Sequence, residues 1–90
     1  MSEANLIQTM REAGLFRAIV MQAIEDLYDP EEKSKALRWI NSDKKAKPDT
    51  GVTFMQACEF GELDARKFRY IASLINDGKL TKKEYQKIVG

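Results

Sequence analysis

Apolar residues recur at helical spacing along most of the chain, and no stretch alternates apolar with polar residues as a half-buried strand does. The first helix is expected over about Glu3 to Tyr28. Between Leu15 and Leu27 it is apolar over most of its circumference, which is typical of a central core helix or a dimer interface. Gly14 interrupts this segment, either as a kink or as a C-cap that divides it in two.

Start and stop residues predict the other helices. Asp29 is a good N-cap and Pro30 suits a first helical position, so a second helix is expected from there through Ile40, ended by residues 41–43. Three later helices follow the same logic. Thr53 caps residues 54–60, Asp64 caps residues 65–75 before a stop at Gly78, and Thr81 with Glu84 forms a capping box for residues 82–89.

These elements predict an all-α fold, a small five- or six-helix bundle in one domain, residues 1–90. The 90 residues are 43% hydrophobic and 32% charged, the balance of a soluble globular chain. Within the domain, residues 1–43 form apolar N-terminal helices and a possible dimer face. Residues 53–76 form a helix-turn-helix-like unit, and residues 77–90 hold the C-terminal capped helix.

The chain lacks the residues that several kinds of chemistry need. It has no His and one Cys, which excludes disulfides within the chain, zinc sites built on Cys or His, and imidazole catalysis. Cys58 is expected to be a small buried hydrophobe. We therefore expect no enzyme, no cofactor and no metal site. No apolar run approaches the roughly 18 residues of a membrane helix and no leader pattern is present, so a cytoplasmic location is expected.

The segment from Thr53 to Ile75 has the residue types of a helix-turn-helix unit. Ala57 is the small residue of the first helix, Gly61 lies in the turn, and Leu63 and Phe68 are the apolar residues that hold the second helix. The turn Gly61–Leu63 is one residue longer than the common tight turn.

The second helix of this unit has a basic side. Phe68, Ile71, Ala72 and Ile75 form the expected buried stripe, which places Arg66, Arg69, Tyr70 and Ser73 on the solvent side with Lys67 at its margin. Arg can bind guanine edges in the major groove and Lys can contact phosphate. An ordinary solvated face of a helical bundle is the alternative.

The charge distribution and one loop bear on the same question. Residues 1–43 carry a net charge of −3 and residues 44–90 carry +4, an asymmetry that marks a nucleic-acid face or is ordinary surface scatter. Residues 44–51 form a polar loop with three lysines, Lys44, Lys45 and Lys47. This loop is either a flexible surface segment or a phosphate-contacting one.

A three-part pattern runs through residues 36–69. It consists of Trp39-Ile40-x-Ser42-Asp43, then Phe54-x-x-x-Cys58-Glu59, then Leu63-Asp64-x-x-x-Phe68-Arg69. In this pattern the chain resembles a class of short, mostly uncharacterised phage and prophage proteins. It departs from the pattern at Ala65, where a Pro often follows the Asp, and at Glu62 in an otherwise apolar turn. The resemblance implies a helical module of phage-like origin.

The leading interpretation is a small DNA-binding regulatory protein, phage- or prophage-encoded, that contacts double-stranded DNA. Its expected DNA contacts are Arg66, Lys67, Arg69, Tyr70 and Ser73 on the helix, and Lys44, Lys45 and Lys47 on phosphates. A homodimer would suit this function, because helix-turn-helix proteins commonly bind two half-sites. The alternative is a protein-interaction module, an adaptor or inhibitor that docks on a host protein through its apolar helices.

Overall fold

The computed structural model describes residues 3–48 and 50–89, with side chains described for residues 13–48 and 50–88. Its helices are α1 (Glu3–Asp26), α2 (Lys33–Asn41), α3 (Phe54–Phe60), α4 (Ala65–Asn76) and α5 (Lys82–Val89). The described residues contain no strand. The all-α prediction is confirmed.

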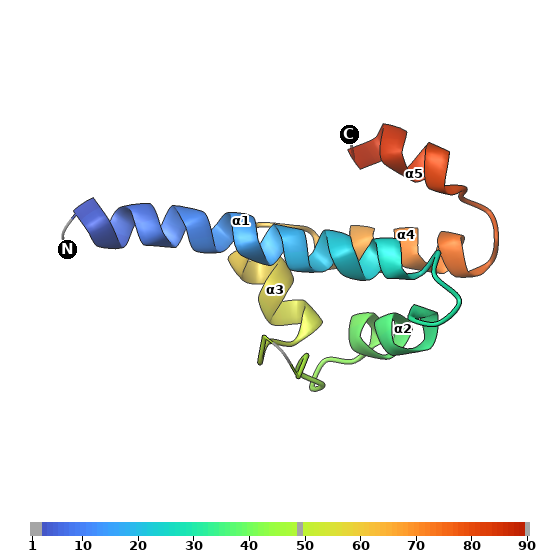
Figure 1. Ribbon diagram of the computed structural model, residues 1–90, viewed down its shortest axis with the longest axis horizontal. Coiled ribbons are helices and arrows are strands. Elements are labelled where there is room, and N and C mark those ends of the chain that lie inside the picture. Colours follow the sequence, from blue (N-terminus) through green and yellow to red (C-terminus); the bar gives the residue numbers. More distant parts are fainter. Residues whose placement is uncertain (1–2, 49, 90) are drawn as a thin grey trace.

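Helix α1 is the spine of the molecule. In Figure 1, α2 and α3 lie on one side of α1 and α5 lies on the other. The first part of α1 extends beyond the other helices, and the molecule measures 47 × 28 × 21 Å along its principal axes. The packed body is therefore built on the C-terminal half of α1.

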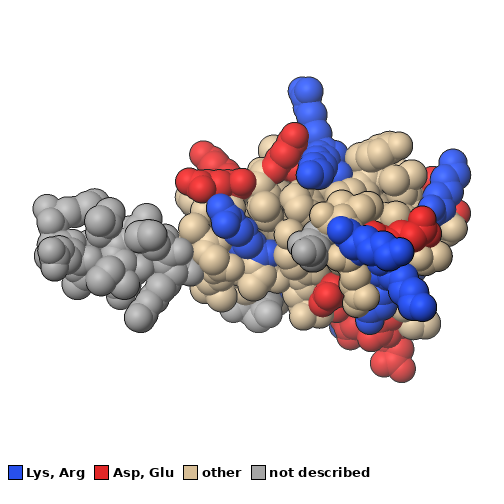
Figure 2. All heavy atoms as spheres, turned by 90° about the horizontal axis from the view of Figure 1, so that it is seen from above, with Lys and Arg blue, Asp and Glu red and all other residues tan. Residues whose placement is uncertain are grey.

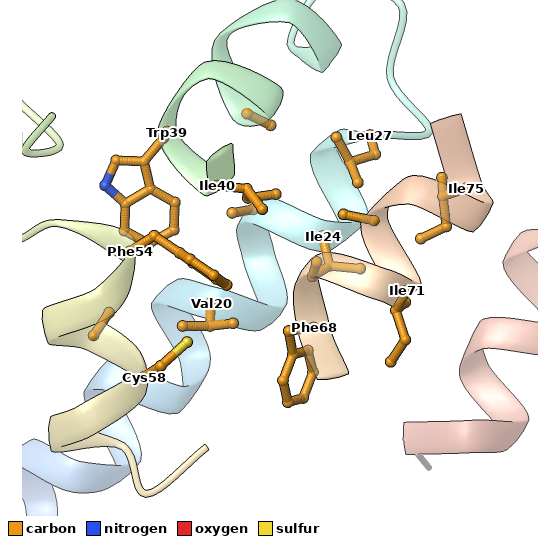
Figure 3. Close-up of a cluster of buried hydrophobic side chains, with 14 of the residues drawn as sticks. Val20, Ile24, Leu27, Trp39, Ile40, Phe54, Cys58, Phe68, Ile71 and Ile75 are labelled. Atoms are coloured by element: carbon orange, nitrogen blue, oxygen red, sulfur yellow. The ribbon is translucent and has the colours of Figure 1, made fainter. Parts of the chain in front are cut away.

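Four helices meet in one hydrophobic core, shown in Figure 3. Val20 and Ile24 of α1, Ile40 of α2 and Phe54 of α3 have no exposed surface. The Trp39 and Phe54 rings meet edge to face with centroids 5.5 Å apart, and the indole Nε1 of Trp39 donates to the Val52 carbonyl at 3.0 Å. Since its polar atom is satisfied, Trp39 can lie in the core without an unpaired donor.

Helix α5 is attached to the opposite side of α1 by aromatic residues. Tyr85 is buried, and its hydroxyl donates to the Met21 sulfur at 3.2 Å. The Tyr28 hydroxyl donates to the Leu80 carbonyl at 2.9 Å, and the rings of Tyr28 and Tyr85 lie 6.4 Å apart. These contacts hold the turn before α5 and α5 itself against the body.

The predicted ends of the last three helices agree closely with the structure. The Thr81 amide donates to the Glu84 carboxylate and the Glu84 amide donates to the Thr81 hydroxyl, which completes the expected capping box. Gly78 has a φ of +74°, and the amides of Gly78 and Lys79 donate to the carbonyls of Ile75 and Leu74. This is a Schellman motif, with glycine at the left-handed position as expected.

Two predictions near the N-terminus were wrong in detail. Helix α1 continues through Gly14 without ending there. Helix α2 begins at Lys33 rather than at Pro30. The Asp29 side chain does accept from the Glu31 amide, but the Asp29 carbonyl accepts from both the Glu32 and Lys33 amides. The residues after Asp29 are consequently held in a turn, and regular helix starts only after it.

Two buried acidic groups predict that the domain loses stability in alkali. Burial raises the pKa of the Cys58 thiol from 9.0 to about 11 and that of the Tyr85 phenol from 10.0 to about 12. Above pH 9 the unfolded chain loses these protons before the folded chain does. The free energy of unfolding should therefore fall as pH rises from 9 to 12.

Urea denaturation at several pH values checks this prediction. The decline above pH 10 should be shallower for Tyr85→Phe, which removes the ionisable group and keeps the ring. Tyr70→Phe is the matched control, since Tyr70 is 65% exposed. An unchanged decline in Tyr85→Phe would contradict the prediction.

Candidate nucleic-acid interface

Helices α3 and α4 form the expected helix–turn–helix-like unit. The Thr53 amide donates to the Gln56 side chain, and the Gln56 amide donates to the Thr53 hydroxyl, so α3 starts with a complete capping box. The Asp64 carboxylate accepts from the Arg66 and Lys67 amides at 3.0 and 3.4 Å and caps α4. Both caps come from local sequence, so the start of each helix is determined close to the turn.

The turn between the two helices uses Gly61 differently from the sequence interpretation. Gly61 has an ordinary φ of −85°, and Glu62 takes the left-handed conformation with a φ of 57°. The Glu62 amide donates to the Glu59 carbonyl and the Leu63 amide donates to the Cys58 carbonyl, which is the Schellman pattern. The extra turn residue is thus accommodated by a regular helix C-cap.

Gly61 is instead required by a close approach to α1. A Cβ at this position would lie 3.0 Å from the Ala57 carbonyl oxygen and 3.1 Å from the Arg17 backbone nitrogen. The Arg17 guanidinium donates to the Gly61 carbonyl, and it pairs with the Glu62 carboxylate at 3.2 Å. The turn is therefore fixed directly against the central helix.

Helix α4 buries the stripe that its spacing predicts. The buried residues are Phe68, Ile71, Ala72 and Ile75. Four of the expected DNA-contacting residues are exposed: Arg66, Lys67, Tyr70 and Ser73. No Asp or Glu occurs from residue 65 to residue 76, so the exposed surface of α4 carries positive side chains without a carboxylate of its own.

Arg69 does not belong to that exposed surface, and its placement on the solvent side was wrong. Its guanidinium donates to the Ile40 carbonyl at 2.9 Å and to the Asp43 carboxylate at 2.8 Å. The same group lies over the Phe54 ring, 5.3 Å from the centroid. Arg69 therefore satisfies the C-terminal end of α2 and joins α2, α3 and α4.

The lysines of the loop after α2 differ in their surroundings. Lys44 and Lys45 are exposed, and their backbone amides donate to the Ser42 hydroxyl at 3.2 and 2.9 Å. Because Arg69 binds Asp43, this end of the loop is held next to α4. Lys47 is half-buried, with its ammonium 5.5 Å from the centroid of the Trp39 ring. Lys47 is thus the least available of the three.

Acidic residues also lie around this surface. Asp43 is mostly exposed beside Arg69, and Glu59 and Glu62 are exposed at the end of α3. On the face drawn in Figure 2, basic side chains of the described residues are interleaved with acidic ones. Any basic surface on α4 is consequently local rather than a property of the whole molecule.

The sequence interpretation missed Asp43 as the partner of Arg69. The two residues are 26 positions apart and no local spacing links them. Among the described residues, no group of three or more His, Cys, Asp or Glu side chains is placed to hold a metal ion. Within the same part of the chain, no helix is long and apolar enough to cross a membrane.

Comparisons with known proteins add no relative. No family model, no curated protein and no solved structure matches the chain.

Proposed function

We propose that this protein binds double-stranded DNA through the exposed surface of α4. The observation that carries the proposal is the set Arg66, Lys67, Tyr70 and Ser73, all exposed on a helix that lacks carboxylates and follows a tight turn. In helix-turn-helix proteins the second helix enters the major groove and its N-terminal residues contact base edges. Arg66 and Lys67 occupy that end of α4.

The proposed contacts have distinct roles. Arg66 binds a base edge, Lys67 binds phosphate, and Tyr70 and Ser73 add hydrogen bonds. Lys44 and Lys45 contact phosphates from the adjacent loop, with a smaller part for Lys47. Arg69 supports this arrangement from inside the fold. A regulatory role, a phage or prophage origin and a homodimer on two half-sites belong to the same proposal, which the likeness of residues 36–69 to phage proteins supports.

Fluorescence anisotropy with mixed-sequence duplex DNA tests the proposal at about 50 and 200 mM salt, where phosphate-dominated affinity changes most visibly. Binding should weaken steeply between the two concentrations. Arg66→Gln/Lys67→Gln should weaken it at least about tenfold and reduce the salt slope by about 1 for each lost phosphate contact. Lys82→Gln/Lys83→Gln on α5 is the matched control, because it removes the same charge from other exposed positions.

Two results would contradict DNA binding at α4. One is an absence of binding at low salt with tens of micromolar protein. The other is equal weakening by the α4 and α5 variants, which would indicate that only the overall charge matters.

A protein-interaction module is the second candidate function. Leu15 of α1 and Phe60 of α3 are 58% and 49% exposed, and Phe60 stacks on Phe16 with ring centroids 5.0 Å apart. These apolar side chains lie near each other on the α1–α3 side of the molecule, and the net charge is only +1. Docking through such a surface should show little dependence on salt, which distinguishes it from DNA binding.

A further inference from the structure

A hollow of about 520 Å³ opens between α1, α2 and the loop that follows α2. Ala23 of α1, Ala36 of α2 and the Trp39 ring line its apolar part. The two alanines leave space there because each contributes only a methyl group. The volume falls within the roughly 300–1,000 Å³ of typical small-molecule sites.

The rim of this hollow is charged, with an excess of positive groups. Lys35, Arg38, Lys45 and Lys47 line it together with the acidic Asp26 and Glu32. Among the described residues, ion pairs are formed by Arg17 with Glu62 and by Arg69 with Asp43. In that part of the chain, none of the four rim cations is neutralised by a close carboxylate.

The loop side of the hollow is held in place. The Lys47 amide and the Trp39 indole both donate to the Val52 carbonyl, at 2.9 and 3.0 Å. The Gly51 amide donates back to the Lys47 carbonyl at 2.7 Å. Because these bonds fix the loop against Trp39, the basic wall and the apolar wall face one space without a rearrangement of the backbone.

We infer that this hollow binds a small organic anion. The apolar or aromatic body of the ligand lies against Ala23, Ala36 and Trp39. Its carboxylate, phosphate or sulfonate group is held by the rim cations, chiefly Lys35 and Arg38 on one side and Lys45 on the other. Lys35 and Arg38 take no part in the proposed DNA contacts, so the inference does not depend on DNA binding.

Two dyes of similar shape and different charge test it: anilinonaphthalene sulfonate and the uncharged N-phenyl-1-naphthylamine. Trp39 is the one tryptophan of the chain, so energy transfer from it to the dye reports occupancy of the hollow. The anionic dye should bind saturably and more tightly than the neutral one. Lys35→Gln/Arg38→Gln should weaken the anionic dye about tenfold and leave the neutral dye within about twofold.

Two further variants make the result specific. Lys45→Gln leaves α2 unchanged and should weaken the anionic dye in the same direction. Lys82→Gln/Lys83→Gln on α5 removes the same charge elsewhere and should change its affinity by less than about twofold. An absence of saturable binding, equal affinity for both dyes, or equal weakening by the α2 and α5 variants would overturn the inference. The titrations contain no DNA, so their failure leaves the proposed function untouched.

Discussion

Replacing Phe54 by Ala should lower the free energy of unfolding by about 3–5 kcal/mol. The Phe54 side chain has no exposed surface. Trp39 meets it edge to face, and the Arg69 guanidinium lies 5.3 Å from its ring centroid. Truncation therefore leaves a cavity and also removes the aromatic surface on which Arg69 rests. Because a small domain is stable by only about 5–15 kcal/mol, much of the fold's stability should be lost.

Urea denaturation followed by circular dichroism measures this change, and Phe60→Ala is its matched control. Both residues lie on α3, but Phe60 is 49% exposed and its ring contact with Phe16 is at the surface. The control should cost about 1 kcal/mol, close to the value of one aromatic pair. Similar losses in the two variants would show that Phe54 is not the centre of the core.

Helix ends in this chain were predictable where the capping atoms are close in sequence. Thr53 with Gln56 and Thr81 with Glu84 each form both bonds of a capping box within four residues. Gly78 takes the left-handed conformation that its place after α4 requires. In these cases the residues that decide the structure are local, so sequence patterns are sufficient.

The roles of Arg69 and Gly61 were not predictable, because distant segments decide them. Helical spacing places Arg69 beside the exposed stripe, but the C-terminal end of α2 supplies the carbonyl and carboxylate that bind it. Gly61 has a turn residue's composition, yet its requirement comes from α1, 44 residues earlier in the chain. The same holds for the hollow, since Lys35 and Lys45 meet only after the loop folds over Trp39. Sequence therefore gives the exposed residues of α4 but not which cation supports the fold.

The substitution Gly61→Ala should destabilise the domain by about 1–3 kcal/mol, and Gly14→Ala should stabilise it by up to about 1 kcal/mol. At Gly61 the φ of −85° suits alanine, so the cost is steric. At Gly14, inside α1, nothing lies within 4 Å of an added Cβ. Alanine there gains helix propensity without a collision. Thermal or urea unfolding of the two variants should give shifts of opposite sign.

The cause of the Gly61→Ala cost can be separated by a second background. An added Cβ would approach three atoms, of which only the Arg17 Cγ belongs to a side chain that can move. The Ala57 carbonyl oxygen and the Arg17 backbone nitrogen are parts of α3 and α1 themselves. Gly61→Ala should therefore remain costly when measured in an Arg17→Ala chain. If Arg17→Ala removed the cost, side-chain crowding would explain the effect, and the glycine would not be what lets the turn lie against the backbone of α1.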